Sequence, residues 1–426
     1  MMKHKVLIIG SGGREHALGW KLKQSPKVEK IYFAPGNAGT AQIGENIDIS
    51  ALDVEGLVKF AKTNKIDLTV VGPDDALAKG VVDTFKENNL MIFGPTKKAA
   101  QIEWSKAFSK NLMTGAGVPT ARYKTFIDLG KARDYLKKQK MPIVIKASGL
   151  ALGKGVIIAR TLGEAENALE KILIKKIFGE AGEELVIEEF LKGDEVSVHA
   201  FSDGKTVSMF PSSRDHKQIF DGNSGPNTGG MGTIAPLAHE TREKLEKVKD
   251  RIVLPIIRGM EKMGITYTGI LYPGIMLTDA GEKVLEFNSR FGDPETQVYM
   301  RILKTDLFDI MRACCRGNLS EINIEWEKKF ACCIVLASEG YPGSYRKGDV
   351  IEGFDVVKKH EDVVIFHAGT KSVDGKILTN GGRVLGVSAT GKTMDEAMDK
   401  AYAVIGKEGV HFKGMQYRKD IGRIKN

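Results

Sequence analysis

The first hundred residues alternate short apolar runs with segments of helical periodicity. Strands are predicted over residues 5–9, 31–34, 68–71 and 90–93, and helices over 15–24, after Asp53, and along Leu77, Val81 and Phe85. This alternation is typical of a parallel sheet covered by helices on both faces. Ligands of such sheets bind beyond the carboxyl ends of the strands, where the loops over residues 10–16 and 72–76 are expected.

The rest of the chain has a different pattern. Strands are predicted over residues 142–147, 156–159, 185–191, 195–201, 206–210, 269–277 and 283–288. A long loop is expected over residues 221–232 and a long helix over 240–263. The last hundred residues indicate a small strand-rich unit with one helix whose apolar face runs from Met394 to Ile405. Together these patterns predict an α/β and α+β multidomain protein.

Composition excludes several classes of protein. The net charge is +9, but the lysines are scattered and no basic stripe is interleaved with aromatic residues, so nucleic-acid binding is not expected. We find no apolar stretch long enough to span a bilayer, so no membrane association is expected. The four cysteines form two adjacent pairs without metal-finger or redox spacing, which fits a reducing cytoplasm.

The first glycine loop is a broken dinucleotide fingerprint. Gly10 and Gly12 lie between a predicted strand and a predicted helix, but Glu15 occupies the third glycine position. Amides at a helix N-terminus, with Arg14 nearby, would still suit a single phosphate. A tight turn without a ligand is the alternative.

The second glycine loop, residues 149–155, is not a Walker A loop. It has one residue too few between its glycines, Gly155 replaces the magnesium-binding hydroxyl residue, and it joins strand to strand. A hairpin flap that closes over phosphates is the favoured interpretation. Lys146 ends the preceding strand on the same face as Val144, and a buried lysine needs an anionic partner. The alternative is a lysine that reaches out to solvent.

Two later strands carry acidic residues. Glu188 and Glu189 end a strand that could act as a hinge against an adenine base, although an exposed edge strand explains them equally well. Alternation places Glu286 and Asn288 on one face of their strand, opposite Leu285 and Phe287. Their oxygens suit a magnesium ion that bridges nucleotide phosphates.

The residues that follow this strand add to the candidate site. Arg290 supplies a fixed guanidinium fork for a carboxylate or phosphate. Asp293 precedes Pro294, a pair that either begins a helix with an Asp cap or places a catalytic carboxylate.

The chain resembles the ATP-grasp superfamily through its strand lysine, glycine flap, acidic hinge and Glu-x-Asn-x-Arg strand. Longer motifs narrow the resemblance to the glycinamide ribonucleotide synthetase family. These motifs span residues 12–16, 34–40, 93–96, 105–108, 215–217, 225–232, 290–295, 366–370 and 380–383.

The resemblance implies a fold and a reaction. The fold would comprise a Rossmann-like N-terminal domain over residues 1–102, an ATP-grasp domain over 103–325 with a flap subdomain at about 122–190, and a C-terminal domain over 326–426. ATP, glycine and 5-phosphoribosylamine would give glycinamide ribonucleotide, ADP and phosphate through glycyl phosphate, in purine synthesis. A cytoplasmic monomer or weak dimer is expected. The alternatives are another ATP-grasp ligase and a non-catalytic nucleotide-binding protein.

The resemblance also implies roles for individual residues. ATP would be held by Lys106, Lys146, Gly153, Lys154, Gly155, Glu188, Glu189, Leu191 and Glu195, and Mg²⁺ or Mn²⁺ by Glu286 and Asn288. Arg290, Lys146 and Asp293 would be catalytic. The two substrates would be bound by Gly12, Gly13, Asp74, Asp215, His216, Lys217, Asn227, Thr228, Gly229, Gly230 and Arg290. Asp74 departs from the glutamate usual in the family, and its carboxylate is one methylene shorter.

Overall fold

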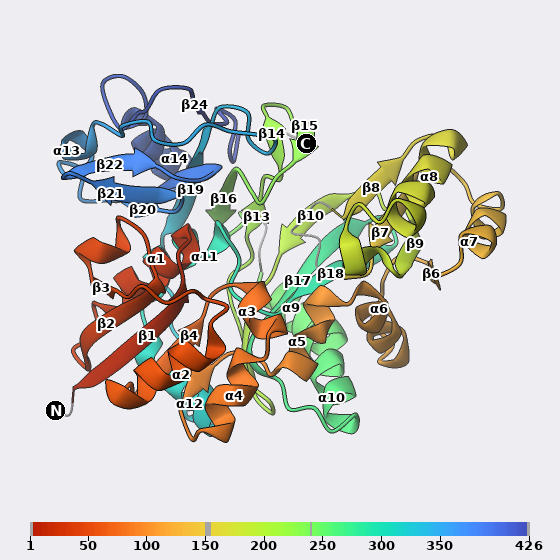
Figure 1. Cartoon of the computed structure of the whole chain (residues 1–426), viewed down its shortest axis with the longest axis horizontal. Coiled ribbons are helices and arrows are strands. Elements are labelled where there is room, and N and C mark those ends of the chain that lie inside the picture. Colours follow the sequence, from red (N-terminus) through yellow and green to blue (C-terminus); the bar gives the residue numbers. More distant parts are fainter. Residues whose placement is uncertain (1–2, 150–154, 239–240, 424–426) are drawn as a thin grey trace.

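The computed structural model describes residues 3–149, 155–238 and 241–423. Its N-terminal part, red and orange in Figure 1, is a five-stranded parallel sheet in the order β3-β2-β1-β4-β5. The strands are β1 (His4–Gly10), β2 (Val28–Pro35), β3 (Glu45–Asn46), β4 (Leu68–Val71) and β5 (Ile92–Phe93). The predicted parallel sheet is therefore confirmed.

Helices connect these strands. They are α1 (Gly13–Leu22), the 3-10 turn η1 (Thr40–Gln42), α2 (Val54–Thr63), α3 (Asp74–Ala78), α4 (Val81–Glu87) and α5 (Lys97–Trp104). Asp53 caps α2 by accepting a hydrogen bond from the Gly56 amide. The single helix predicted along Leu77, Val81 and Phe85 is wrong, because Gly80 adopts φ +85° and separates α3 from α4.

A small antiparallel sheet lies at the other end of the molecule, in yellow (Figure 1). It follows α6 (Lys106–Gly115), and its order is β6-β9-β7-β8. Its elements are β6 (Tyr123–Phe126), α7 (Leu129–Leu136), β7 (Ile143–Ala147), β8 (Val156–Ala159), α8 (Leu162–Leu169), the π-helical turn η2 (Glu170–Ile174), the 3-10 turn η3 (Gly179–Gly182) and β9 (Leu185–Glu189). Ile143 and Ile145 pack into the core of this unit.

The central antiparallel sheet is organised around its longest strand, β17 (Thr268–Thr278). β10 (Asp194–Ser197) and β11 (Ala200–Asp203) pair with it at successive positions, β12 (Val207–Met209) pairs with β11, and β18 (Gly281–Asn288) pairs with β17. The single strand predicted over residues 195–201 is therefore two strands. A register shift also leaves Leu285 without a partner on β17, since Gly274 faces Glu286 and Ile275 faces Val284.

The predicted long helix after residue 240 is present but interrupted. α9 (Arg242–Val248) continues through a π-helical turn, η4 (Lys249–Val253), into α10 (Leu254–Lys262). The π-helical turn, in which the spacing of the backbone hydrogen bonds widens, ends shortly before Pro255. The ring and the missing N–H of this proline disfavour regular α-helical hydrogen bonding.

The C-terminal sheet, green and blue in Figure 1, has the order β13-β16-β19-β23-β20, with β24 also paired to β19. Two of its strands, β13 (Arg214–Asp215) and β16 (Gly232–Ala235), come from the middle of the chain. The others are β19 (Phe330–Ser338), β20 (Val363–His367), β23 (Arg383–Gly391) and β24 (Met415–Gln416). The last hundred residues therefore do not build this sheet alone.

The remaining elements complete these layers. They are the hairpin of β14 (Gln218–Phe220) and β15 (Ser224–Asn227), α11 (Glu295–Ile302), α12 (Leu307–Arg316), the 3-10 turn η5 (Leu319–Glu321), α13 (Phe354–Val357), the hairpin of β21 (Thr370–Val373) and β22 (Lys376–Thr379), and α14 (Met394–Ala403). The hairpin of β14 and β15 corrects the predicted loop over residues 221–232, and Ile405 lies beyond the end of α14. In the described part of the chain, no helix is long and apolar enough to cross a membrane.

Candidate active site

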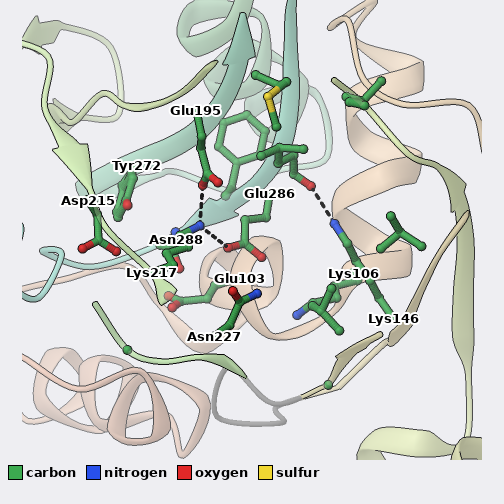
Figure 2. A pocket seen from close by; sticks show the side chains of 18 of the residues that line it. Glu103, Lys106, Lys146, Glu195, Asp215, Lys217, Asn227, Tyr272, Glu286 and Asn288 are labelled. Atoms are coloured by element: carbon green, nitrogen blue, oxygen red, sulfur yellow. Dashed lines mark hydrogen bonds and ion pairs between the residues drawn. The ribbon is translucent and has the colours of Figure 1, made fainter. Parts of the chain in front are cut away.

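A cleft with a cavity volume of about 330 Å³ lies between the small sheet and the central sheet. This volume falls in the range of small-molecule sites, roughly 300–1,000 Å³. In Figure 2, Lys106 and Lys146 lie on one side, and Glu195, Lys217, Glu286 and Asn288 lie on the other. The structure therefore brings together the predicted lysines and the predicted acidic strand.

Lys146 is a buried cation at the end of β7. Its Nζ forms an ion pair with Glu188 Oε1 and donates a hydrogen bond of 3.3 Å to the Leu285 carbonyl oxygen. Burial would lower the pKa of Lys146, but the Glu188 and Glu286 carboxylates outweigh it and hold this pKa above its ordinary value. A residue that is only 5% exposed does not reach solvent, so the alternative of a solvent-directed lysine is wrong.

Glu188 is held by two lysines. Its Oε2 lies 2.5 Å from Lys110 Nζ, while its Oε1 contacts Lys146. Burial opposes ionisation of Glu188, but these lysines overcome it and lower the pKa of the carboxyl. β9 lies between β6 and β7, so the alternative of an exposed edge strand is wrong.

Apolar side chains from both sheets face each other across the cleft, as expected of a site for a flat base. They are Val144, Ile158, Phe190, Leu191, Met276, Leu285 and Phe287. The bulge explains why Leu285 lines the cleft although strict alternation predicted that it would face away. The Glu189 carboxylate is bound by Arg122 and Lys283, so its side chain is already partnered.

Lys106 begins α6 and lines the same cleft. Ser105 caps this helix by accepting a hydrogen bond from the Phe108 amide. The Lys106 amide donates to the Ser148 carbonyl oxygen at 2.8 Å, which ties the start of α6 to the chain that leaves β7. The two predicted phosphate-binding lysines are therefore held together by the backbone.

Glu286 lies among cations. Its Oε1 is 4.0 Å from Lys217 Nζ, and Lys217 forms its closer ion pair with Glu195. Burial opposes ionisation of Glu286, but Lys217, Lys106, Lys146 and Arg290 outweigh it and lower the pKa of the carboxyl to about 2. Glu286 is therefore ionised at neutral pH.

Glu286 and Asn288 fit a divalent cation. Both line the cleft, and Asn288 Oδ1 accepts only a long hydrogen bond of 3.3 Å from Arg290. Among the described residues, no group of three or more His, Cys, Asp or Glu side chains could hold a metal on its own. A cation bound here would complete its shell with phosphate oxygens and water, as magnesium commonly does.

Arg290 is fixed by a buried carboxylate that the sequence did not single out. Its Nη2 lies 2.9 Å from Glu103 Oε1, and Glu103 Oε2 accepts hydrogen bonds from the amide and the hydroxyl of Ser289. Burial lowers the pKa of Arg290, but the Glu103 carboxylate raises it, and the net pKa lies above its ordinary value. Asp74, at the start of α3, lines the cleft close to this pair.

Three carboxylates surround the far end of the cleft. Glu295 Oε1 accepts a 2.6 Å hydrogen bond from the Tyr272 hydroxyl, and Gln297 donates to Asp293 Oδ1 at 2.8 Å. Asp215 Oδ1 is buried without a hydrogen-bond partner, and burial together with the Glu295 charge raises the pKa of Asp215 well above its ordinary value. Groups that could receive an amine therefore lie at this end.

Asp293 does not cap α11 with its side chain, which corrects that alternative. Its Oδ2 instead lies 3.5 Å from Arg383 Nη2. Arg383 Nη1 also donates to the carbonyl oxygens of Asp293 and Gly229, at 2.7 and 2.6 Å. Arg383 on β23 thus connects Asp293 to the loop that carries Asn227, Thr228, Gly229 and Gly230.

In the first glycine loop, the Glu15 carboxylate lies at the amide end of α1. The Gly12 amide donates to Glu15 Oε2 at 2.5 Å, and Arg14 Nε lies 2.6 Å from Glu15 Oε1. The residue that breaks the dinucleotide fingerprint therefore occupies the amide end of α1 itself. Gly12 instead lines a second hollow with Asn37, Asp293 and Arg383.

Other predicted residues lie outside the main cleft. His216 points away from it, because its Nδ1 lies 3.0 Å from the Gly232 carbonyl oxygen and its Nε2 accepts from the Gly422 amide. Gly13 packs against Gln297, where a side chain would collide. Gly155 lines the cleft, whereas Gly153 and Lys154 lie outside the described residues.

The sequence reasoning assigned no role to several residues that the geometry places in or beside the site: Glu103, Lys110, Tyr272, Glu295 and Arg383. Glu295 and Arg383 lie within motifs that carried the family resemblance, and that was an available signal. Glu103 and Lys110 lie in helices without any local pattern that marks them.

Comparison with known families gives full-length matches. Models of the N domain, the ATP-grasp (A) domain and the C domain of phosphoribosylglycinamide synthetase match residues 4–103, 104–296 and 331–424. The phosphoribosylamine–glycine ligase of Caldanaerobacter subterraneus subsp. tengcongensis is 48% identical over 417 residues, which cover 98% of this chain and 99% of that protein. The ligase of Escherichia coli K12 is 49% identical over 425 residues, 98% of each chain.

Solved structures are also similar. The phosphoribosylamine–glycine ligase of Thermotoga maritima has a TM-score of 0.85 at 37% identity, covering 98% of this chain and all 100% of that one. The biotin carboxylase domain of Hydrogenobacter thermophilus 2-oxoglutarate carboxylase, in complex with ADP magnesium salt and bicarbonate, has a TM-score of 0.72 at 18% identity, covering 98% and 92% of the two chains. The second likeness shows the fold alone.

Proposed function

The chain belongs to the phosphoribosylglycinamide synthetase family, and we infer that its cleft joins glycine to 5-phosphoribosylamine at the expense of ATP. It is an ATP-grasp ligase of purine biosynthesis. The products are glycinamide ribonucleotide, ADP and phosphate.

The nucleotide would occupy the half of the cleft next to the small sheet. The apolar walls suit an adenine base, with Glu188, Glu189 and Leu191 at its edge through their backbone, and Glu195 is placed for the ribose. Lys106 and Lys146 would contact the phosphates, together with Gly155 and the flap residues Gly153 and Lys154. Support comes from the buried, charged state of Lys146 beside open space.

Ligases of this type use ATP and a divalent metal ion. We propose that Glu286 and Asn288 hold Mg²⁺ or Mn²⁺ here, because they are an ionised carboxylate and an amide oxygen on one wall of the cleft. When bound, such an ion neutralises charge on the transferring phosphoryl group. The side chains of the protein position the reactants.

The other half of the cleft would receive glycine and the phosphoribosylamine. Arg290, held by Glu103, is directed at a carboxylate or acyl phosphate, and Asp74 lies beside it. Asp215, with its unpartnered oxygen, would attract the amine, and Lys217 would fix the acidic wall. Gly12, Asp293 and the loop of Asn227 to Gly230 would contact the phosphoribosyl part; His216 and Gly13 support the fold behind them.

The chemistry requires an activated carboxylate. A carboxylate oxygen of glycine attacks the terminal phosphoryl group of ATP, ADP leaves, and the amine then displaces phosphate from the glycyl phosphate and loses a proton. Positioning and electrostatic stabilisation suffice for the phosphoryl step. The observation that carries the proposal is the convergence of four charged residues on one cleft: Lys106 of α6, Lys146 of β7, Glu286 of β18, and Arg290 of the segment that follows β18.

We further propose the domain division 1–102, 103–325 and 326–426, with the flap subdomain at about 122–190, and a cytoplasmic enzyme that acts as a monomer or weak dimer without nucleic acid or membrane. All four cysteines are free thiols, which supports a reducing compartment.

The purified protein tests this function directly. ADP release should require both glycine and phosphoribosylamine, and omission of either should reduce it to background. ADP release that proceeds with bicarbonate in place of glycine would instead support the rival, another ATP-grasp ligase.

A further inference from the structure

Lys110 is a buried cation behind the cleft. It lies on α6, one turn after Lys106, and its side chain is 3% exposed. Its Nζ contacts Glu188 Oε2 at 2.5 Å and donates to Thr120 Oγ1 at 2.7 Å. Lys110 is absent from the residues that line the cleft, so any influence on a nucleotide there would pass through Glu188.

The pairing of Glu188 with Lys146 does not require Lys110. Glu188 and Lys146 are 2% and 6% exposed at the side chain and already form an ion pair of opposite charges. A third buried charge adds a desolvation penalty. This penalty shows in Lys110, whose pKa is lowered by burial despite the Glu188 carboxylate.

The charge of the cluster differs with and without Lys110. The charges of Glu188 and Lys146 alone sum to zero. The Lys146 ammonium would then attract a further anion only weakly, because the Glu188 carboxylate offsets its charge. With Lys110 on the second carboxylate oxygen, the three groups carry one net positive charge. A ligand in the cleft meets this positive charge at Lys146, because Lys146 lines the cleft and Lys110 does not.

We propose that Lys110 is a positioning residue that, by occupying one oxygen of Glu188, keeps Lys146 able to attract nucleotide phosphates. This inference rests on the proposed function, in which Lys146 contacts those phosphates. It predicts that Lys110 determines the preference of the cleft for ATP over adenosine, although it contacts neither.

The test is the ratio of the dissociation constants of adenosine and magnesium ATP, measured by calorimetry without glycine or phosphoribosylamine. Because both ligands carry adenosine, the ratio reports how much the phosphates contribute to binding and cancels any change in the binding of the adenine base. Lys110→Met should lower it by about tenfold or more, the effect of one charge at short range in a partly buried site. Lys110→Met/Glu188→Gln restores one net positive charge at Lys146 and should recover most of the lost ratio.

The control variants separate the possible failures. Lys124→Met removes an exposed lysine from β6 and should leave the ratio unchanged. If Lys146→Met also leaves it unchanged, the phosphate role of Lys146 fails and the inference fails with it. If Lys146→Met lowers the ratio but Lys110→Met does not, or the double variant is no better than Lys110→Met, only the role of Lys110 is overturned.

A purely structural role for Lys110 would give a different pattern. In that case Lys110→Met would lower the stability of the protein, and adding Glu188→Gln would not recover the ratio of dissociation constants. If Lys110→Met does not fold, the folded double variant is compared with the unmodified protein. A ratio within about threefold supports the inference and a tenfold loss overturns it, since both proteins carry the same net charge at the cluster.

Discussion

Glu286 is the residue on which the proposed metal site depends most. Its carboxylate stays ionised because lysine and arginine side chains surround it, and it projects into the cleft. Glu286→Gln keeps the size of the side chain and removes the charge. We expect turnover to fall by about 10²–10³ or more, as when one preorganised electrostatic contact is lost, while the thermal unfolding midpoint changes little.

Glu282 provides the matched control for this prediction. It lies on the same strand, but its carboxylate pairs with Lys247 and Arg251 outside the cleft. Glu282→Gln should leave turnover and metal dependence unchanged. Near-normal turnover in folded Glu286→Gln would remove Glu286 from the metal site.

At the scale of elements, β23 of the C-terminal sheet holds in place the loop of residues 227–230, for which we propose a substrate contact. Arg383 donates to the backbone of Gly229 and Asp293, which belong to two different segments. Arg383→Met should release both segments, so KM for phosphoribosylamine should rise by about tenfold or more, as when a hydrogen-bonded charged partner is removed. The affinity for ATP, measured without the other substrates, should not change. A loss of ATP affinity of the same size would contradict this assignment.

The elements also show what the sequence could and could not predict. The parallel sheet was predictable because the periodicity of apolar residues and the turn residues between elements are local signals. The common face of Glu286 and Asn288 was predictable from the alternation of side chains along one strand. The bulge at Leu285 was not, because it depends on the register with Gly274 and Ile275 of another strand. The ion pairs of Glu188 were not predictable for a related reason: its partner Lys110 comes from a distant helix.

At the scale of the whole molecule, three buried histidines make stability depend on pH, and two of them join parts distant in sequence, since the His367 amide donates to His16 Nδ1. Burial lowers the pKa of His16 to about 3 and those of His216 and His367 to about 4. In the unfolded chain these histidines bind protons as the pH falls below about 6.5, whereas in the folded protein they bind them only near pH 4 or below. Stability is therefore present above pH 6.5 and is lost as the pH falls toward 4, by about 1.4 kcal/mol per pH unit for each histidine.

Thermal unfolding at pH 7 and pH 5 checks this linkage. His216→Gln should unfold at a lower temperature at pH 7 but lose less stability on acidification than the unmodified protein. His360 is exposed, so His360→Gln should leave the pH dependence unaltered. An unchanged pH dependence in His216→Gln would contradict the lowered pKa, because it would show that His216 binds a proton equally well in the folded and unfolded states.

The central claim is that the cleft activates glycine by phosphorylation, and labelled oxygen tests it most directly. Glycine that carries heavy oxygen in its carboxylate is turned over with ATP and phosphoribosylamine, and the released phosphate is analysed by mass spectrometry. If the Lys146, Glu286 and Arg290 side chains serve a phosphoryl transfer to glycine, each turnover should place one labelled oxygen atom in phosphate. Product formation with unlabelled phosphate would contradict the glycyl phosphate route and the roles given to these residues.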